Sequence, residues 1–337
     1  MEGEKDYLLV NGEDIYVEDY LSSRSLDKLK NFVGNTKLLV IDEAQKIPDI
    51  GANLKLLVDH LPDLAIVSTG SSVFDLARQM GEPLTGRKKV LHLFPLSQME
   101  LGALETASQT KANLECRLIF GSYPEVVLLP SDREREEYLQ ELIRDYLFKD
   151  ILAMDGVKKS KKLVQLLQLI AFQIGKEVSY SELATQLGMS KSTVEKYLDL
   201  LEQVFVLVNI RGFSRNLRSE VTKTSRYYFY DLGIRNTLIN NFNPLSIRND
   251  TGTLWENYLV MERLKKQHYQ NIYSNNYFWR TYDQKEIDWV EEREGGLSAY
   301  EFKWSGKKTQ ALKLWHKTYP DAPFTLIDRE NYLPFIT

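Results

Sequence analysis

The sequence has 337 residues, of which 43% are hydrophobic and 11% aromatic, and its formal net charge is −4. This composition excludes a disordered chain and supplies enough apolar side chains for two or three folded domains. The single cysteine, Cys116, excludes an internal disulfide, and no Cys/His spacing indicates zinc. The N-terminus lacks an apolar leader, and the most apolar stretch, residues 163–175, is too short to cross a bilayer. We therefore expect a soluble cytoplasmic protein with no membrane partner.

Charge is distributed unevenly along the chain. Residues 1–155 contain 17 basic and 27 acidic side chains, residues 156–230 contain 12 and 6, and residues 231–337 contain 14 of each. A basic segment between acidic and neutral neighbours is typical of nucleic-acid contact. A chance fluctuation of composition explains the same distribution, so both interpretations stay open.

The first third of the chain alternates short apolar runs with helical patterns. Residues 7–10 predict a strand, and residues 22–32 and 53–61 predict helices. The apolar runs at residues 38–41 and 64–67 are typical of strands that are buried on both faces. This alternation predicts a parallel sheet with helices on both faces.

Asp42 and Glu43 directly follow the second of these strands, at the end where open α/β sheets bind their ligands. In P-loop ATPases an acid at this point holds Mg²⁺, and the next acid orients the attacking water. The other half of such a site is a G-x-x-x-x-G-K-[ST] loop that binds the phosphates. The sequence contains no such loop, and its nearest approach is residues 306–309. We therefore expect an ATPase core without the strand and phosphate loop that normally begin it.

Three further residues extend the ATPase interpretation. Thr69 and Ser71 follow the next apolar strand, where a hydroxyl group can contact the γ-phosphate. For Ser71 the alternative role is the N-cap of a helix at residues 73–80. Arg87 lies on a turn before a strand predicted at residues 90–94. In ring ATPases an arginine reaches the γ-phosphate of a neighbouring subunit, and Arg87 is our candidate, with an ordinary surface arginine as the alternative.

The middle of the chain is helical and then matches a helix-turn-helix template. Residues 98–155 are strongly charged, as in the small helical lid that follows an ATPase core. In residues 181–198, Ala184 lies where two helices cross and Gly188 lies in the turn. Strands predicted at residues 205–210 and 226–230 then form a wing, so the pattern predicts a winged helix.

The second helix of this template carries the candidate DNA-binding residues. They are Lys191, Ser192, Thr193 and Lys196, together with Arg215 further along the chain. Glu195 on the same face weakens the attraction to DNA, and winged helices also dock proteins. DNA and a partner protein therefore stay open as equal alternatives.

The last third of the chain carries a second acidic constellation. Glu256 lies near the start of an amphipathic helix. Glu301 and Lys303 are two residues apart on a predicted strand and therefore project from one face, with Asp288 opposite them on the neighbouring strand. Asp288 and Glu301 suit a Mg²⁺ ion, and Lys303 suits a role in positioning or deprotonating water. A cross-strand salt bridge on a solvated sheet face is the alternative.

Taken in order, these segments resemble the prokaryotic AAA-type ATPases that carry a C-terminal domain of unknown function. The resemblance spans nearly the whole chain, and the combination is more specific than any single motif. The matching strings are LLVIDEAQ (38–45), TGSS (69–72), LTGR (84–87), PLS (95–97), YPEV (123–126), YDLGIRN (230–236), GTLWEN (252–257), EIDWV (286–290) and EFK (301–303).

The resemblance implies an α/β multidomain fold. It places an incomplete P-loop ATPase-type parallel sheet at residues 1–97, a helical lid at residues 98–155, a winged helix-turn-helix at residues 156–230 and a restriction-endonuclease-like α/β domain at residues 231–337. It implies ATP and Mg²⁺ as cofactors, with Asp42 as the metal-site acid and Glu43 as the catalytic acid/base. Glu256, Asp288, Glu301 and Lys303 take the pattern positions of the PD-(D/E)xK nuclease fold, in which Ile287 replaces the proline.

Three functions follow from these patterns. The favoured one is a fragment of an ATP-driven, DNA-associated protein, which without a phosphate loop is not expected to hydrolyse ATP by itself. The second is a Mg²⁺-dependent nuclease on a remnant ATPase scaffold, and the third is a non-enzymatic regulator that binds DNA or protein. The assignment of Arg87 also implies a homo-oligomer.

Overall fold

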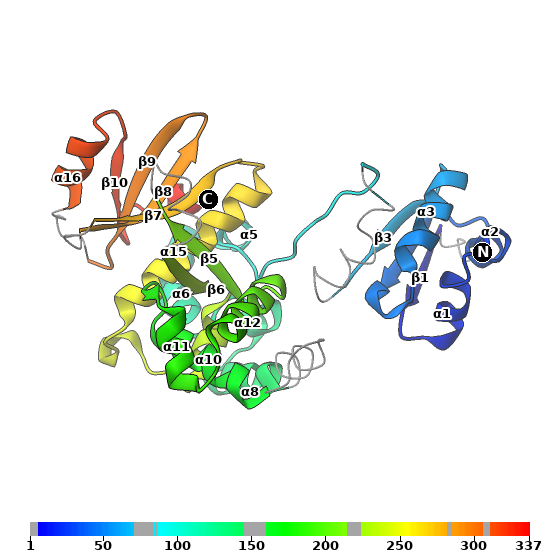
Figure 1. Cartoon of the computed structure of the whole chain (residues 1–337), viewed down its shortest axis with the longest axis horizontal. Coiled ribbons are helices and arrows are strands. Elements are labelled where there is room, and N and C mark those ends of the chain that lie inside the picture. The colour runs from blue at the N-terminus through cyan, green and yellow to red at the C-terminus, as the bar shows by residue number, and fades with distance from the viewer. Residues whose placement is uncertain are drawn as a thin grey trace. The chain divides into compact units, whose positions relative to one another are not determined.

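The computed structural model describes residues 6–70, 84, 86–144, 160–213, 224–281, 285–305 and 311–337. The chain forms two compact units, Met1–His92 and Leu93–Thr337, here called the N-terminal and C-terminal units (Figure 1). Each unit encloses a hydrophobic core of its own side chains. Within the described residues, no helix combines the length and apolarity that a bilayer crossing requires.

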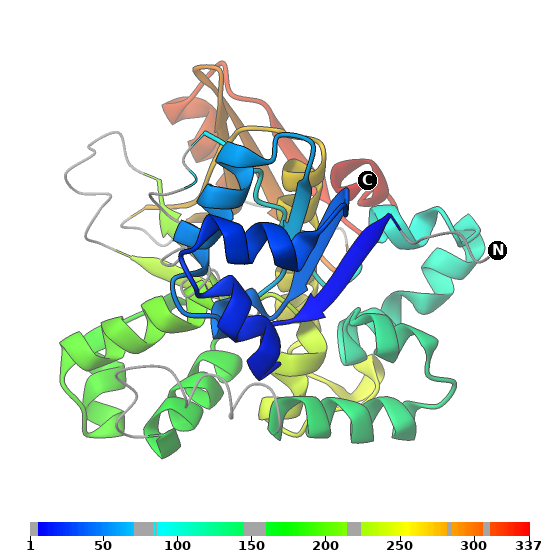
Figure 2. The same cartoon turned by 90° about the vertical axis from the view of Figure 1, so that its right-hand side faces the viewer.

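The N-terminal unit, blue in Figure 2, is built on three parallel strands paired in chain order. The strands are β1 (Tyr7–Asn11), β2 (Leu38–Asp42) and β3 (Ala65–Ser68), and the helices are α1 (Ile15–Leu21), α2 (Leu26–Val33) and α3 (Ile50–His60), with a 3-10 turn η1 (Ala44–Lys46). The predicted parallel sheet is confirmed. Residues 22–32 divide differently from the prediction, because Ser22 ends α1 and Ser25 caps α2 by accepting from the Lys28 N–H.

One face of this sheet is packed and the other is open. Leu39 and Ile41 of β2 are fully buried in a core to which α1, α2 and α3 all contribute. On the opposite face, Leu9, Val40 and Val67 lie in one row across the three strands. Leu9 is 63% exposed and Val67 is 50% exposed. The prediction of helices on both faces therefore holds for one face in the described part of this unit.

The strand predicted at residues 90–94 is wrong, because this segment has no regular secondary structure. Leu91 is 72% exposed and Leu93 is 96% exposed. A strand needs a neighbour to satisfy its backbone N–H and C=O groups, and no described strand pairs with this segment. The helix predicted at residues 73–80 lies outside the described residues.

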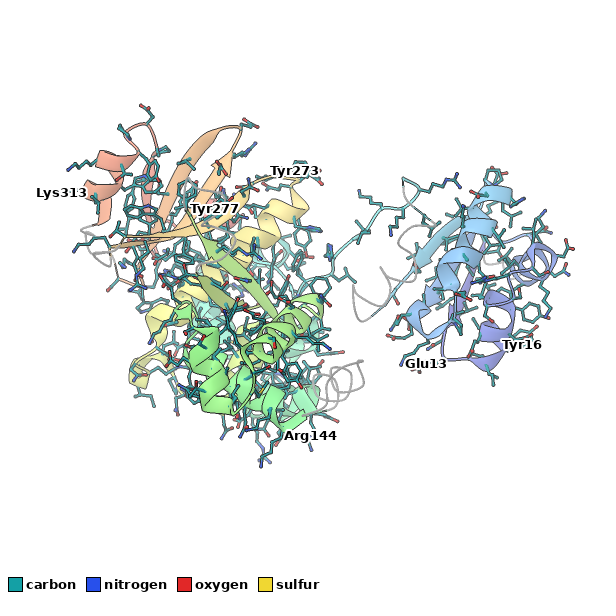
Figure 3. All side chains as sticks on the ribbon, viewed as in Figure 1. Glu13, Tyr16, Arg144, Tyr273, Tyr277 and Lys313 are labelled. Carbon is teal, nitrogen blue, oxygen red and sulfur yellow. The ribbon has the colours of Figure 1, made fainter. Side chains whose placement is uncertain are left out.

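The C-terminal unit contains a seven-stranded sheet with the order β10-β9-β8-β7-β5-β6-β4 among the described residues. The strands are β4 (Glu177–Val178), β5 (Leu207–Gly212), β6 (Ser225–Phe229), β7 (Asn275–Arg280), β8 (Glu286–Arg293), β9 (Gly296–Phe302) and β10 (Phe324–Ile327). A short parallel pairing of β5 with β7, in which Tyr277 (labelled in Figure 3) lies opposite Arg211, joins the two halves of the sheet. The predicted winged-helix and nuclease-like regions therefore share one sheet.

Helices cover this sheet and extend the unit. They are α5 (Gln98–Gly102), α6 (Ala107–Phe120), α7 (Pro124–Leu128), α8 (Asp132–Leu142), α10 (Ser160–Phe172), α11 (Tyr180–Leu187), α12 (Lys191–Gln203), α14 (Leu232–Leu238), α15 (Thr251–Tyr269), α16 (Ala311–Thr318) and α17 (Leu333–Ile336), with a 3-10 turn η4 (Leu245–Ile247). At the predicted helix-turn-helix, Gly188 ends α11 with φ 58°, and Ser190 caps α12 by accepting from the Thr193 N–H. Both helices form at the predicted place, whereas their assignment to a winged helix stays a prediction.

The segment that follows His92 is anchored to α15. The Leu96 N–H donates to the Ser122 carbonyl at 2.8 Å, and the Gln98 N–H donates to the Glu262 carboxylate at 2.5 Å. Lys265 donates to both Glu262 and the Leu96 carbonyl. The compact C-terminal unit therefore begins before residue 97 and contains all of residues 98–337, and the predicted boundaries inside it stay predictions.

Candidate functional site

The carboxyl edge of the N-terminal sheet brings together three predicted residues. Asp42 ends β2 and Thr69 directly follows β3, so the parallel pairing of these strands places them side by side. The Thr69 hydroxyl donates to Asp42 Oδ1 at 2.5 Å, and the Glu43 N–H donates to Thr69 Oγ1 at 3.3 Å. The arrangement presents two carboxylates and a hydroxyl at one edge, as the sequence predicts.

The backbone at Glu43 is shaped by a tight approach from β1. Glu43 has φ 52°, a left-handed conformation that is unfavourable for a residue with a side chain. A Cβ atom at Gly12 would lie 2.5 Å from the Glu43 carbonyl oxygen, so glycine is required there. Gln45 Nε2 then donates to Glu43 Oε2 at 2.5 Å and fixes the carboxylate. Beside this turn, Glu13, at the surface in Figure 3, pairs with Lys46 at 3.7 Å.

Arg87 does not join this acidic edge. Its guanidinium contacts the carboxylate of Asp59, near the C-terminal end of α3. Because α3 connects two parallel strands, it returns along the sheet and ends at the edge opposite Asp42. Ser71, the other predicted phosphate-contacting residue, lies outside the described residues.

The second candidate site is an acidic cluster in the C-terminal unit, formed by Glu256, Asp288 and Glu301 together with Lys303. Asp288 and Glu301, on the adjacent strands β8 and β9, are 6% and 3% exposed. The Phe302 N–H donates to Asp288 Oδ2 at 2.8 Å, and Lys303 Nζ lies 2.6 Å from Glu301 Oε1. Glu256 reaches the cluster from the first part of α15, as predicted.

Three residues that the sequence reasoning missed complete this cluster. Arg226 and Tyr228 lie two apart on β6, and Glu286 begins β8. Arg226 pairs with Glu286 at 2.6 Å and with Glu256 at 3.6 Å, and the Tyr228 hydroxyl donates to Glu256 Oε1 at 2.7 Å. No motif marks Arg226 or Tyr228, and Glu286 begins the matching string EIDWV without having been assigned a role. The only available signal is the two-residue spacing of Arg226 and Tyr228, which puts them on one face of the strand.

Burial and mutual repulsion raise the pKa values of the cluster carboxylates. Burial, followed by the nearby Asp288 carboxylate, raises the pKa of Glu256 from 4.5 to about 8 and that of Glu301 from 4.5 to about 7. Burial also raises the pKa of Asp288, although the Phe302 N–H opposes this. Burial lowers the pKa of Lys303, but its hydrogen bond to Glu301 and the nearby carboxylates outweigh burial and raise it overall.

One oxygen atom of the cluster lacks a partner. Glu301 Oε2 is buried and accepts no hydrogen bond from any residue that the structure describes. An unsatisfied carboxylate oxygen suits a cation, so the residues fit a Mg²⁺ ion in this respect. In the described part of the chain, no three His, Cys, Asp or Glu side chains are grouped so that they could hold a metal. An ion here would therefore use two carboxylates, with water or substrate oxygens as its other ligands.

The predicted DNA-binding face of α12 carries two lysines and one glutamate. Lys191 pairs with Glu195 at 3.6 Å, and the Ser190 hydroxyl lies within 3.0 Å of the hydroxyls of Ser192 and Thr193. Lys196 is exposed. Residues 180–203 contain two lysines against four acids. Arg215 lies outside the described residues.

Comparison with known proteins identifies three regions of the chain. Residues 2–102 match an AAA domain, residues 111–245 match a domain of unknown function (DUF8612), and residues 251–331 match another (DUF4143). The AAA match includes the acidic edge at Asp42 and Glu43, and the DUF4143 match includes Glu256, Asp288, Glu301 and Lys303.

The similar proteins are themselves uncharacterized. One from Mycobacterium tuberculosis is 27% identical over 287 residues, which cover 84% of this chain and 62% of the relative. One from Methanocaldococcus jannaschii is 22% identical and covers 94% of this chain and 73% of the relative, and one from Haemophilus influenzae is 28% identical over 50% of this chain and 44% of the relative. This chain therefore spans less than two thirds of the mycobacterial protein. It combines an N-terminal AAA domain with a C-terminal DUF4143 domain, and it is similar to uncharacterized prokaryotic proteins.

Proposed function

We propose that the N-terminal unit is the acidic half of an ATP·Mg²⁺ site in an AAA-type ATPase. The observation that carries this proposal is the meeting of Asp42, Glu43 and Thr69 at the carboxyl edge of parallel strands, within the AAA match. When bound here, Mg²⁺ would neutralise phosphate charge. The two acids are already held in place, so they would not have to rearrange as the reaction proceeds.

Each of the three residues has a defined task in this proposal. Asp42 would hold the metal, and its hydrogen bond from Thr69 fixes the direction of its carboxylate. Glu43 orients the attacking water, and Gln45 restrains the Glu43 side chain. The Thr69 hydroxyl, which donates to Asp42, would donate to a γ-phosphate oxygen once ATP is bound.

The N-terminal sheet has an open edge and an open face, and both are consistent with a site that one more segment would complete. In the described part of the N-terminal unit, the outer edge of β3 is unpaired, and the face with Leu9 and Val67 is uncovered. Parallel sheets are normally covered on both faces. A strand beside β3 followed by a helix over the open face would satisfy both surfaces, and their connecting loop would lie next to Thr69, on the side away from Asp42. A G-x-x-x-x-G-K-[ST] loop in that connection would supply the phosphate contacts that are absent from the 337-residue sequence.

A graft tests this proposal. A designed strand, G-x-x-x-x-G-K-[ST] loop and helix are fused ahead of β1, and Mg·ATP binding is measured by isothermal titration calorimetry. We expect binding in the grafted chain and none in the ungrafted chain or in a graft whose loop lysine is replaced by alanine. Protection of the β3 amides from hydrogen exchange shows whether the graft has docked. A docked graft that binds no Mg·ATP would refute the proposal.

Arg87 extends the proposal to a homo-oligomer. Because it lies at the sheet edge opposite Asp42, it can serve only a neighbouring subunit's site. In a grafted chain that hydrolyses ATP, Arg87→Ala should leave ATP binding intact and lower turnover by roughly a thousandfold. If ATP turnover per chain depends neither on protein concentration nor on Arg87, then Arg87 does not act in the site of a neighbouring subunit.

A second candidate function rests on the unpaired Glu301 oxygen beside Asp288 and Lys303. In this proposal the C-terminal unit is a divalent-cation-dependent nuclease. Asp288 and Glu301 would hold the cation, and Lys303 would position or deprotonate the attacking water. The predicted contacts of α12 and Arg215 would bring DNA to the unit. When bound, the cation would supply charge stabilisation for the phosphodiester.

Plasmid cleavage in Mn²⁺ tests the second candidate. Lys303→Ala should abolish cleavage, whereas Lys313→Ala, which removes an exposed lysine of α16 (Figure 3), should leave it unchanged. An inert wild-type chain would exclude the nuclease. Equal losses in both variants would point to general charge rather than to a catalytic lysine.

A further inference from the structure

The arginine on β6 reaches into the acidic cluster from the opposite side to Lys303. Lys303 follows β9 and pairs with Glu301, whereas Arg226 lies on β6 and pairs with Glu256 and Glu286. The two cations of the cluster thus have different carboxylate partners. Glu256 forms an ion pair with Arg226, and Glu301 forms one with Lys303.

Arg226 is fixed in this position. Its side chain is 3% exposed, and its guanidinium lies 4.3 Å above the ring of Phe278. Such stacking adds to the two ion pairs and restrains the planar group. Its Nε is buried with no hydrogen-bond partner among the described residues, so its contacts come from the two terminal nitrogens and the ring.

Glu256 is equally restrained. Tyr228 donates to its Oε1, and Arg226 approaches the same oxygen. A Cβ atom on Gly175 would lie 2.9 Å from Glu256 Oε1, so the backbone at Gly175 closes another side of the carboxylate. These contacts hold the Glu256 carboxylate toward β6, whereas the unpaired oxygen of the cluster belongs to Glu301 on β9.

We propose that Arg226 is a built-in cation that keeps Glu256 out of the metal site, so that a divalent ion binds between Asp288 and Glu301 alone. This inference rests on the metal site of the second candidate function. The guanidinium pairs with Glu256 at 3.6 Å, and its positive charge repels an arriving ion. Two carboxylates with several water ligands suit Mg²⁺, whereas a third carboxylate would favour larger ions with more protein ligands. Arg226 therefore sets both the strength and the selectivity of cation binding.

Mn²⁺ binding, followed by the electron paramagnetic resonance signal of the free ion, tests this inference without any catalytic assay. Arg226→Gln should bind Mn²⁺ about tenfold more tightly than wild type, because one nearby positive charge is removed and Glu256 is released. The double variant Arg226→Gln/Glu256→Gln should lose most of this gain. Arg280→Gln is the matched control, because Arg280 lies on β7 in the same sheet and pairs with Glu177, outside the cluster, at 2.8 Å. It should change Mn²⁺ affinity little.

A single substitution that leaves Arg226 in place provides a second test. Glu256→Gln should leave the Mn²⁺ affinity of the otherwise wild-type chain unchanged, because Glu256 is not a ligand there. A clear loss of affinity would show that Glu256 binds the ion and would overturn the inference. An unchanged or weakened affinity in folded Arg226→Gln would also overturn it. If Asp288→Asn and Glu301→Gln do not weaken Mn²⁺ binding, the metal site itself is wrong.

Discussion

In the N-terminal unit, Asp42 lies exposed at a sheet edge with a hydroxyl partner, whereas Asp288 and Glu301 in the C-terminal unit lie buried among opposite charges. The exposed acid needs no internal cation, because water solvates its charge. The buried acids cannot be solvated in this way, and the fold supplies Arg226 and Lys303 instead.

This difference in burial shows why aspartate and glutamate side chains in the two units need different surroundings before they can bind a cation. An acid on an open edge can take a metal and phosphate as soon as the remaining ligands are provided. An acid in the buried cluster already has charged neighbours, so an incoming ion must bind beside Arg226 and Lys303. In our proposals, ligand binding by the first unit depends on a segment that would complete the sheet, and cation binding by the second depends on the charges already inside the cluster.

The largest expected effect is the loss of Arg226. Arg226→Ala removes a buried guanidinium that pairs with Glu256 and Glu286 and stacks on Phe278, and it should lower the free energy of unfolding by about 3–5 kcal/mol. All five tryptophans lie in the C-terminal unit, so tryptophan fluorescence during urea unfolding reports on that unit alone. Arg280→Ala breaks a partly exposed pair and should cost about 1 kcal/mol or less. If the two variants lose equal amounts of unfolding free energy, Arg226 has no special role in stabilising the buried acidic cluster.

The one-sided packing of the N-terminal sheet predicts the next effect. Ile41→Ala removes a fully buried side chain and should destabilise this unit by about 2–5 kcal/mol. Val40→Ala, on the next residue and the open face, should cost less than about 1 kcal/mol. Hydrogen exchange of the β1, β2 and β3 amides measures both. A similar cost for the two variants would mean that the second face is covered in solution.

The buried carboxylates predict a pH dependence of smaller size. Glu256 and Glu301 have raised pKa values of about 8 and about 7, so between 4.5 and these values the folded state binds more protons than the unfolded state. Their contribution to stability is complete below pH 4.5 and is lost as the pH rises through about 7 and about 8.

Fluorescence-detected melting of the C-terminal unit checks this dependence. The melting temperature should fall as the pH rises from about 5 to about 9, and Glu256→Gln should flatten the fall by removing one titrating group. A melting temperature that rises over this range would contradict the assigned direction of the pKa shifts.

The smallest expected effect on stability concerns α12. Reversing the charges of Lys191 and Lys196 should change the unfolding free energy by less than about 0.5 kcal/mol, because both side chains are on the surface. If α12 contacts DNA, the same double variant should weaken DNA binding and reduce the salt dependence of the affinity. Unchanged DNA affinity would exclude these contacts and favour protein docking.

Local patterns predicted most of the elements that carry the two acidic groups. The apolar runs before Asp42 and Thr69 were sufficient for the parallel strands, because buried strands need uninterrupted apolar side chains. The two-residue spacing of Glu301 and Lys303 predicted that they share one face, and the structure brings their side chains together at 2.6 Å, a pair within one strand segment that the sequence reasoning did not foresee. Their chemical roles stay predictions, because geometry alone does not fix them.

The sequence did not predict features of the structure that depend on contacts between residues far apart in the chain. Residues 90–94 have the composition of a strand, yet composition does not provide the neighbour that its backbone needs. Arg226 belongs to the cluster only because the pairing of β5 with β7 joins two regions into one sheet. No local pattern encodes that pairing, so the cation that balances Glu256 was invisible in the sequence.

The most direct test of the proposed ATP site compares two acids of the N-terminal unit in the grafted chain. Mg·ATP is titrated calorimetrically into the graft carrying Asp42→Asn or Asp59→Asn, the second of which removes the acid that contacts Arg87 at the opposite edge. The ATP-site proposal predicts that Asp42→Asn weakens Mg·ATP binding by about tenfold or more and that Asp59→Asn does not. Equal affinity in the two variants would contradict the assignment of Asp42 to the metal site.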